Sequence, residues 1–569
     1  MYGFKRHIKR SFSLLDGIWD FNFWGDINAD HLTPPGMVYH DRMPVPSAFD
    51  AYPSYAGKRG IAIYRTFFHV QSGKKSLLVF RGTGMWTRIL VDGQILKTVS
   101  LPYSRIEIEV PPAGREEREL AVICDNRFDF SRIPLQENFY DFYAYGGIFR
   151  SVELHILPEI SFRRVKLFPQ DVKSGEIKGE IFFRGMDQGC MEIKISTDGK
   201  NPEKKQLAIS GGRAEISFLV PDARPWSALQ PALHTITVES ADDDIRERIG
   251  FRTIGVQDGR ITLNGEKIKL LGYCRHETHP QFGPAVSAAQ HVQDIEIIKS
   301  LGCNFIRGSH YPQDPVFLDL CDEMGIYVFE ESMGWGNREK HFTDPAFYRA
   351  QILQTELMLE KSINHPSVIM WGFLNEGASD QEYARPLYRD LYALVHREDK
   401  SRPVTHASMF GLTDICYEYA DIISINTYPG WYAENNDNPR PLDEINSRID
   451  RLIAHLEKAG CGKKPFLLSE IGAGAIYGFR DPLAAHWSEQ YQADYLETVC
   501  RRVITEERLS GVSLWQFCDG RTYATSRALG RPRGFNNKGT FDEYRRPKTS
   551  AAKIREIFCS GILKPENIL

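Results

Sequence analysis

The stretch "SVIMWGFLNEG", residues 367–377, begins as a run of apolar side chains and ends in an adjacent asparagine and glutamate. The apolar run predicts a buried strand, and Asn375 and Glu376 follow at its carboxyl end. A buried carboxylate is costly unless it is paired or used in chemistry. Glu376 therefore needs a partner or a chemical role, and the fold decides which residues can meet it.

The chain from residue 255 onward alternates predicted strands with amphipathic helices. Eight strands, each followed by a helix, over roughly 300 residues are the count for a (β/α)₈ barrel. A doubly wound open sheet is the alternative, but no glycine-rich phosphate loop follows the first strand. The pattern favours a TIM barrel over residues 255–569. The candidate strands are 268–273, 303–308, 325–331, 368–376, 402–408, 422–428, 465–471 and 511–519.

Residues 1–254 consist instead of short strand candidates separated by Gly, Asp and Pro. Over residues 1–157 the alternation of apolar and polar positions predicts an antiparallel, jelly-roll-like β-sandwich. Residues 158–254 repeat the pattern with shorter strands, and this length suits a seven-strand immunoglobulin-like sandwich of ~100 residues. The predicted fold is therefore multidomain, with two β-sandwiches followed by a (β/α)₈ barrel.

Composition narrows the range of partners. A formal net charge of -4 over 569 residues gives no strong field for nucleic acid or an anionic membrane. No run approaches the ~18 apolar residues of a membrane helix, and Asp16 interrupts the short apolar stretch near the N-terminus, unlike a signal peptide. The ten cysteines are scattered singly, which predicts reduced thiols rather than disulfides. We expect a cytoplasmic protein that acts on a small molecule without a metal or cofactor.

A second glutamate has the same setting as Glu376. The seventh strand candidate, "PFLLSEIG", is an apolar run that ends in Ser469 and Glu470. Barrel active sites form at the carboxyl ends of strands, so the fourth and seventh strands should present their glutamates across one pocket. Two facing carboxylates are the arrangement of a glycosidase. Each glutamate alone could simply pair with an arginine, but Asn375, which can bond a sugar hydroxyl, strengthens the functional interpretation.

Further polar and aromatic residues lie at other predicted strand ends. His276 ends the first strand, and Arg307 and His310 end the second, so each histidine has an arginine nearby. Structural histidines are the ordinary alternative, but two of them at one barrel mouth favour ligand contact. Tyr428 ends the sixth strand, within reach of a side chain on the seventh. Trp515 ends the eighth and could stack on a sugar ring, or else belong to the core.

Four motifs in this order resemble those of glycoside hydrolase family 2: "GYCRHETHP", "NFIRGSHYP", "NHPSVIMWGFLNEG" and "PFLLSEIG". The domain order is also that of the family, so the resemblance covers essentially the whole chain. It implies Glu376 as general acid/base and Glu470 as nucleophile of a retaining hydrolase, with carboxyl groups ~5 Å apart and no metal. Burial and the charge of Glu470 should raise the pKa of Glu376, which must be protonated to act as an acid. The resemblance also allows a homo-oligomer.

The loop "GFNNKG", residues 534–539, follows the eighth strand and resembles the carboxylate-reading N-x-K element of the β-glucuronidases in this family. A sugar carboxylate binds well to a cation and an amide donor on one loop, which Lys538 and Asn536 would supply. The same residue types are also common in solvated turns. Asp141, in the first domain, matches a position from which the resembling enzymes reach the sugar O4.

One departure from that subgroup lies four residues before Asn536. The β-glucuronidases usually carry an arginine there, close to O4, whereas this chain has Pro532, which has no side-chain donor. Loss of that contact opens space for an axial O4. Galacturonate has an axial O4 and glucuronate an equatorial one, and the two sugars differ only there. Arg531 or Arg533 could restore the lost contact to O4.

The sequence therefore predicts a retaining exo-β-D-hexuronidase for β-D-galacturonides, β-D-glucuronides or both, with a slight preference for galacturonides. A strict β-glucuronidase is the main alternative. A carbohydrate-binding protein on a decayed barrel is a remote alternative, because such a protein would be expected to lack one of the two carboxylates, and both are present.

Overall fold

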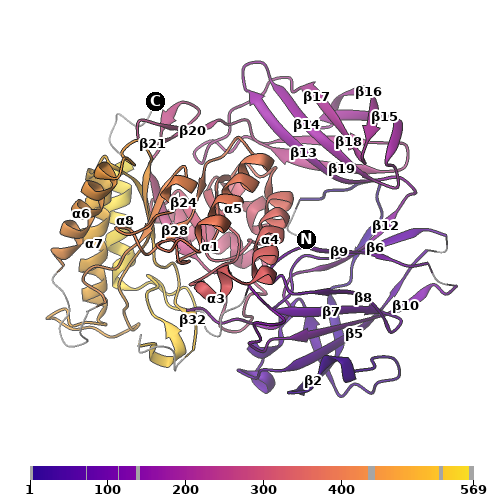
Figure 1. The fold of residues 1–569 in the computed structure, drawn as a ribbon, viewed down its shortest axis with the longest axis horizontal. Coiled ribbons are helices and arrows are strands. Elements are labelled where there is room, and N and C mark those ends of the chain that lie inside the picture. Colours follow the sequence, from indigo (N-terminus) through magenta and orange to yellow (C-terminus); the bar gives the residue numbers. More distant parts are fainter. Residues whose placement is uncertain are drawn as a thin grey trace.

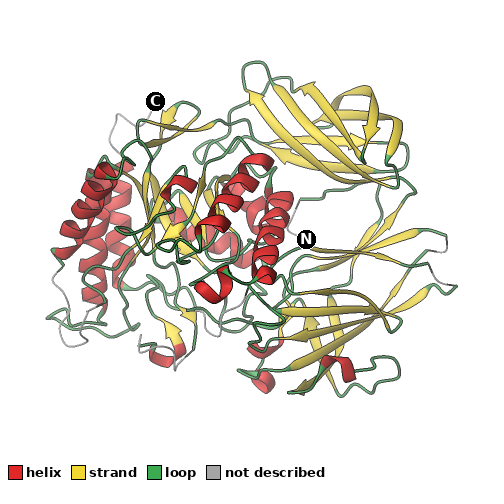
Figure 2. Cartoon of the chain, in the orientation of Figure 1, coloured by secondary structure: helices red, strands yellow, loops and turns green. Residues whose placement is uncertain are grey.

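The computed structural model of the chain describes residues 4–71, 73–112, 114–135, 141–432, 442–523 and 530–562. Two all-β parts lie on the right of Figure 1, the first in indigo below and the second in magenta above. A larger part lies on the left, and Figure 2 separates its red helices from the yellow strands that they surround. The predicted order of two β-rich parts followed by an α/β part is confirmed.

The N-terminal part is an antiparallel sandwich of two sheets, in the orders β1-β12-β6-β9 and β3-β2-β5-β10-β7-β8, with β4 and β11 as a separate pair. Phe21 from one sheet and Leu78 and Ile108 from the other pack into one core, because alternate residues of a strand point to the same face. The strands are β1 (Phe12–Leu14), β2 (Gly17–Gly25), β3 (Asp41–Val45), β4 (Ser47–Ala48), β5 (Ile61–His69), β6 (Lys75–Phe80), β7 (Trp86–Val91), β8 (Gln94–Val99), β9 (Ile106–Val110), β10 (Glu117–Asp125), β11 (Gly147–Ile148) and β12 (Val152–Leu157).

The second part contains seven strands, as predicted, hydrogen-bonded in the order β13-β14-β17-β16-β15-β18-β19. β17 alternates exposed and buried residues along its length, which separates a solvent face from a core face. Ile181, Ile216 and Ile236 belong to that core. The strands are β13 (Ser161–Asp171), β14 (Glu176–Arg184), β15 (Gln188–Thr197), β16 (Lys200–Ser210), β17 (Arg213–Leu219), β18 (His234–Glu239) and β19 (Asp244–Ile249).

The C-terminal part is a ring of parallel strands, preceded by the small sheet β20 (Ile254–Gln257), β21 (Arg260–Leu263) and β22 (Glu266–Lys267). The fifth strand of the ring is split at His406 into two halves; β27 pairs with β26, and β28 pairs with β29. These two halves close the barrel. The strands are β23 (Leu270–Arg275), β24 (Phe305–Gly308), β25 (Tyr327–Glu331), β26 (Val368–Gly372), β27 (Val404–Thr405), β28 (Ala407–Ser408), β29 (Ile423–Asn426), β30 (Phe466–Ile471) and β31 (Leu509–Leu514).

Helices follow most of the barrel strands, as predicted, but the fifth strand departs from the ideal (β/α)₈ pattern. Within the described ranges, only a 3-10 turn, Tyr417–Tyr419, separates β28 from β29. Asp414 accepts the backbone N–H of Cys416 at 2.7 Å, and such a side-chain bond favours a turn over a helix. The helices are α1 (Ala288–Ser300), α2 (Pro315–Met324), α3 (Glu339–Phe342), α4 (Pro345–Ser362), α5 (Arg385–Glu398), α6 (Glu444–Lys458), α7 (Glu489–Thr505) and α8 (Thr549–Ile562).

The first sandwich is fixed to the barrel beside the carboxyl ends of its first two strands. Arg150 Nη2 donates to Glu277 Oε2 at 2.7 Å, and both side chains are buried. Tyr103 stacks on Tyr311 with ring centroids 3.8 Å apart. A buried ion pair and an aromatic stack hold this contact in one geometry, which brings the loop that begins at Asp141 to the barrel mouth.

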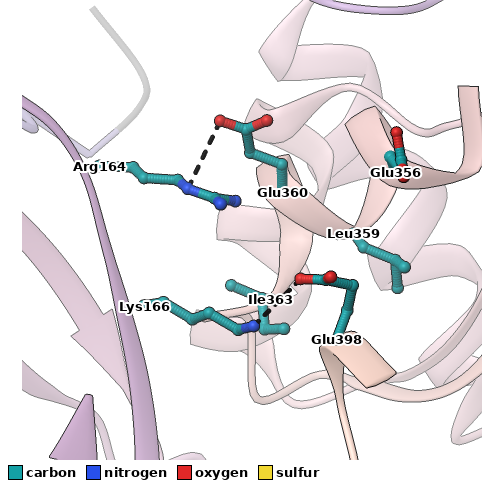
Figure 3. A pocket seen from close by; sticks show the side chains of 7 residues that line it. All are labelled: Arg164, Lys166, Glu356, Leu359, Glu360, Ile363 and Glu398. Carbon is teal, nitrogen blue, oxygen red and sulfur yellow. Dashed lines mark hydrogen bonds and ion pairs between the residues drawn. The ribbon is translucent and has the colours of Figure 1, made fainter. Parts of the chain in front are cut away.

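The second sandwich lies against α4 and α5, on the outside of the barrel. A cavity of about 170 Å³ lies at this contact. In Figure 3, Arg164 points toward Glu360 and Lys166 toward Glu398, with nitrogen–oxygen distances of 3.5 and 3.3 Å. Because these charges neutralise one another across the contact, the cavity is a domain junction rather than the candidate active site.

None of the ten cysteines is paired in a disulfide, seven of them are buried, and Cys190 is exposed. None of the helices within the described ranges combines the length and the apolar character needed to cross a membrane.

Candidate active site

Glu376 lies on an irregular segment just beyond β26. The strand ends at Gly372 rather than at residue 376 as predicted. Leu374 and Glu376 have φ angles of 52° and 53°, in the left-handed region that non-glycine residues seldom adopt, and this conformation breaks the strand ladder. The Glu376 N–H donates to the Ala407 carbonyl at 2.8 Å. Backbone strain of this kind concentrates at functional sites.

The Glu376 carboxyl group is surrounded by groups from other strands. Asn426, at the end of β29, donates its side-chain amide to Glu376 Oε1 and to Asn375 Oδ1, both at 3.0 Å. Burial, followed by the negative charge of Glu470, raises the pKa of Glu376 to about 7. The predicted rise and its two predicted causes are confirmed. At neutral pH a large fraction of Glu376 therefore carries the proton that a general acid needs.

Glu470 lies within β30 and is 4% exposed. Arg307 Nη1 donates to its Oε1 at 2.7 Å. The Tyr428 hydroxyl donates to its Oε2 at 2.6 Å, so Tyr428 is within reach of the seventh strand, as expected. Donors on both oxygens hold the carboxylate in one orientation. Arg307 bonds both Glu470 and Asn375, and Asn426 bonds both Asn375 and Glu376, so the two glutamates belong to one hydrogen-bonded network.

Arg307 links the segments that carry the two glutamates through buried hydrogen bonds. It is completely buried, and besides Glu470 it donates to Glu331 Oε2 at 2.7 Å and to Asn375 Oδ1 at 2.8 Å. Its position at the end of the second strand predicted that Arg307 contacts the substrate. Its protein partners indicate instead that it positions the residues that face the pocket.

His310, His276 and Trp515 come together next to this network. His310 stacks on Trp515 with centroids 5.2 Å apart, and His276 meets the Trp515 ring edge-on at 5.5 Å. Burial lowers the pKa of His310 to about 3 and the pKa of His276 well below its usual range, so both rings are neutral near pH 7. His310 Nδ1 donates to Glu331 Oε1 at 3.0 Å.

The tautomer of His276 follows from its hydrogen bonds. The Tyr311 hydroxyl accepts the Glu277 N–H at 3.1 Å and lies 3.3 Å from His276 Nδ1. Its own proton can therefore go to Nδ1, which leaves the ring proton on Nε2. Nε2 is buried and has no hydrogen-bond partner within the part of the chain that the structure describes.

Lys538 is a buried cation at the other side of the pocket, 2% exposed. Its Nζ donates to the Tyr432 hydroxyl at 2.7 Å, and it lies 5.5 Å from the ring centroids of Tyr428 and Trp431. Burial and the nearby Arg531 lower the pKa of Lys538 well below its usual range. None of the carboxylates in the described ranges forms an ion pair with it. The protonated form of Lys538 is therefore disfavoured until an anion binds beside it, so this setting favours an anionic ligand.

Asp141 connects the first sandwich to the loop that follows β31. Arg531 Nε donates to Asp141 Oδ1 at 2.8 Å, and Arg531 Nη2 bonds the other oxygen. Asn536 Nδ2 also donates to Asp141 Oδ2, at 2.9 Å. Asp141 therefore lies against this loop and bonds both Arg531 and Asn536, while its reach toward the sugar O4 stays a prediction.

Of the two arginines that flank Pro532, the structure brings Arg531 to the site. Pro532 begins a short 3-10 turn and is half-buried. Arg533 points elsewhere, is exposed, and pairs with Glu543 at 3.0 Å. Pro532 cannot donate a hydrogen bond to the sugar O4, but Arg531, its neighbour in the sequence, lies at the site and has such donors. This is one of the two possibilities, Arg531 or Arg533, that the sequence left open.

Three residues of this network were missing from the sequence analysis. Glu331 and Asn426 are polar residues at the ends of buried strands, in "YVFEE" and "SINTY", so the rule that identified Glu376 would have found them. Tyr432 lies outside any strand. Its contact with Lys538 depends on how two loops meet, which no local pattern indicates.

Two clusters of potential metal ligands lie elsewhere, His7 with Asp243 and Asp244, and Asp319 with Asp322 and His365. An arginine already binds one carboxylate of each cluster: Arg10 Nε donates to Asp243 at 2.9 Å, and Arg6 donates to Asp319 at 3.3 Å. Part of the negative charge that would attract a metal ion is thus already paired. The chemistry of the barrel mouth rests on carboxyl, amide, phenol and ammonium groups.

Comparison with known proteins places this site in a family. Residues 162–252 match "Glycosyl hydrolases family 2", and residues 254–560 match "Glycosyl hydrolases family 2, TIM barrel domain". A β-glucuronidase of Paenibacillus borealis is 28% identical over 97% of both chains.

Solved structures agree over nearly the full length. A family 2 β-galacturonidase from Eisenbergiella tayi, bound to galacturonate, is 35% identical over 98% of both chains, with a TM-score of 0.89. A Bifidobacterium dentium β-glucuronidase complexed with coumarin-3-O-glucuronide has the same fold, with 24% identity over 97% of both chains and a TM-score of 0.87. The chain belongs to glycoside hydrolase family 2 and is a glycoside hydrolase.

Proposed function

We propose that this protein is a retaining exo-β-D-hexuronidase that removes a β-linked galacturonic or glucuronic acid from a small conjugate. The observation that carries the proposal is the buried Lys538, whose Nζ lies 5.5 Å from the ring centroid of Tyr428, the residue whose hydroxyl bonds Glu470. A neutral sugar has no charge that could pair with a desolvated ammonium group. The carboxylate of a uronic acid can form an ion pair with it and so offset the free-energy cost of burying the ammonium group. The relatives named above as β-galacturonidase and β-glucuronidase support the same substrate class.

In the first step, a carboxylate oxygen of Glu470 attacks the anomeric carbon of the sugar. The bond to the aglycone oxygen breaks, and Glu376 donates its proton to that oxygen. The products are the free aglycone alcohol and a glycosyl ester on Glu470. Tyr428 and Arg307, which bond the two Glu470 oxygens, hold the carboxylate for in-line attack.

In the second step, Glu376 acts as a base. It takes a proton from a water molecule, whose oxygen attacks the anomeric carbon while the ester bond to Glu470 breaks. Two inversions give net retention of the β configuration. Glu376 alternates between acid and base most easily because its pKa lies at about 7, near the working pH.

Three groups around the reacting carbon would bind the rest of the sugar. Asn375 Nδ2 and His276 Nε2 are buried donors without hydrogen-bond partners in the described parts of the chain, and each suits a sugar hydroxyl. The face of Trp515 supplies an apolar platform for the ring. Because Asn375 directly precedes the proposed acid Glu376, we assign its donor to the hydroxyl next to the anomeric carbon.

Recognition of O4 would fall to the Arg531–Asp141 pair. This pair closes the pocket end that carries Asn536. A sugar that carries a further unit on O4 would have to displace the Arg531–Asp141 pair. The enzyme would therefore act on a terminal sugar, which is an exo reaction. We favour galacturonide because Pro532 removes the donor that usually meets an equatorial O4, and because the 35% identical relative is a β-galacturonidase.

The test is a four-substrate comparison of the purified protein on nitrophenyl β-D-galacturonide, β-D-glucuronide, β-D-galactoside and β-D-glucoside. We expect the uronides to be hydrolysed at least about 10²-fold faster than the neutral sugars, as kcat/KM. NMR of the first product should show the β anomer. Equal rates on neutral and acidic sugars would refute the uronide proposal, and an α product would refute retention.

A further inference from the structure

A buried ion pair beside the loop of Asn536 and Lys538 takes no part in the proposed chemistry. Lys548 Nζ donates to Asp519 Oδ1 at 2.8 Å, and both side chains are 0% exposed. Burying a charge pair is costly, and replacing such a pair with apolar residues is often neutral or favourable for stability. A contribution to stability therefore does not explain well why this pair is buried here. Its other hydrogen bonds indicate that it holds the neighbouring loop in place.

The Asp519 carboxylate holds the loop that carries Asn536 and Lys538. Its Oδ1 accepts the Gly539 N–H at 2.9 Å, and its Oδ2 accepts the Asn537 side-chain amide at 3.2 Å. These two contacts bracket Lys538. A Cβ added at Gly539 would lie 2.2 Å from the Asp519 backbone nitrogen, so the loop can approach this closely only with glycine at that position.

Lys548 connects the same loop to the strand of the nucleophile. Besides Asp519, its Nζ donates to the Asn537 carbonyl at 3.1 Å and to the Ala475 carbonyl at 2.7 Å. Ala475 follows β30, which carries Glu470, and its own N–H donates to the Asn537 carbonyl at 2.9 Å. An ammonium group has three protons, and here each has an acceptor.

We propose that Lys548 and Asp519 are positioning residues that fix the distance between the carboxylate-binding loop and the nucleophile Glu470. The pair tightens binding of the uronic acid although neither residue touches the sugar. This inference rests on the proposed function. It goes beyond that proposal because it assigns substrate affinity to two buried residues outside the pocket.

The main test is Lys548→Met, which removes the cation and keeps the volume. Burial already raises the pKa of Asp519 to about 6, so at pH 6 or below the variant can hold a neutral Asp519 and fold. A misplaced loop should raise KM for the nitrophenyl uronide, and Ki for free D-galacturonate, about tenfold or more. A merely structural role would instead reduce the titratable active fraction and leave the KM of the remaining enzyme unchanged.

The matched control is Arg10→Met. Arg10 pairs with Asp243, with side-chain exposures of 3% and 0%, where the two sandwiches meet. This variant also leaves an unpaired buried aspartate, so it should lose stability while keeping the wild-type KM and Ki. Thermal melts and active-site titration with a 2-fluoro uronide report the folded and the competent fractions.

A milder variant keeps the inference testable if Lys548→Met does not fold. Asn537→Ala removes the amide that bonds Asp519 and leaves the ion pair intact, so KM and Ki should rise about two- to fivefold. KM and Ki within twofold of wild type in the folded variants would overturn the inference, whatever happens to kcat or to stability. Failure of the wild type to hydrolyse uronides would instead refute the proposed function, so the two outcomes are distinguishable.

Discussion

Arg307 Nη1 donates a 2.7 Å hydrogen bond to Glu470 Oε1 from a completely buried position. The same guanidinium group donates to Asn375, the neighbour of Glu376. One cation thus fixes the orientation of the proposed nucleophile and of the segment that carries the proposed acid. Charge-assisted hydrogen bonds from a rigid, planar guanidinium group hold their acceptors in a fixed orientation.

Glu470→Gln tests the nucleophile. Glutamine keeps the shape, its one amide oxygen can still accept from Arg307, and the Tyr428 hydroxyl can turn to accept from the amide NH2. The fold should therefore persist while kcat falls about 10³-fold or more. A 2-fluoro hexuronide should accumulate as an ester on Glu470 of the wild type, located by peptide mass spectrometry. Label on a different residue, or ordinary turnover by the variant, would remove Glu470 from this role.

Glu376→Ala tests the acid. The variant should be nearly inactive on conjugates with poor leaving groups, because those need a proton, yet retain part of its activity on a dinitrophenyl uronide. Added azide should restore turnover and give the β-azide. An equal loss on both classes of substrate would show that Glu376 does not donate the proton.

The pH profile follows from the pKa of Glu376, which is raised to about 7. The acid works only when protonated, so kcat/KM for a poor leaving group should be retained below this value and fall tenfold per unit as the pH rises above it. The dinitrophenyl uronide should show a weaker fall. Removing the charge of Glu470 by Glu470→Gln should lower the pKa of Glu376, which an NMR titration can measure. A profile that stays flat to pH 9 would contradict the assignment.

The sequence was sufficient for the architecture because the barrel strands are nearly continuous apolar runs with polar ends. It failed where a distant contact decides the backbone. β26 stops at Gly372 because Leu374 and Glu376 turn into positive φ, and the Glu376 N–H finds its acceptor on Ala407, a neighbouring strand. Nothing within residues 367–377 indicates that partner.

In the candidate site, too, local sequence patterns predict some residues, whereas others depend on contacts between distant parts of the chain. Glu376, Glu470 and Tyr428 follow from the strand-end rule, because their positions depend on local register. Which of three adjacent residues faces Asp141 depends on the turn at 532–534, where Arg533 has a φ of 61°. That turn directs Arg531 inward and Arg533 to solvent, and the sequence alone could not distinguish the two.

Lys538→Met tests carboxylate recognition, because methionine keeps the volume without the charge. Transition-state binding of a uronide should weaken by about 2–4 kcal/mol, measured as kcat/KM. Any trace activity on a neutral pyranoside should not fall. Lys269→Met is the control, since Lys269 bonds backbone carbonyls of Val503 and Glu506 at the amino end of β23. An unchanged preference for acidic sugars would assign recognition to a different cation, with Arg531 the nearest candidate.

The ratio of kcat/KM on nitrophenyl β-D-galacturonide to that on the β-D-glucuronide tests the substrate. The two differ at one stereocentre, so their ratio isolates the O4 contact. Pro532 provides no donor to an equatorial O4, so the wild type should turn over galacturonide at least comparably. A site that bonds a hydroxyl can discriminate against its epimer by orders of magnitude.

Three variants assign that contact. Pro532→Arg should shift the ratio toward glucuronide, with Asp141 available to orient the new guanidinium. Arg531→Ala should reduce discrimination between the epimers, because it removes the cation bound to Asp141. Arg533→Ala is the matched control, since its side chain is exposed and pairs with Glu543, and it should leave the ratio unchanged. A wild type that strongly prefers glucuronide, and loses the preference in Arg531→Ala, would show that Arg531 replaces the usual arginine and that the enzyme is a β-glucuronidase.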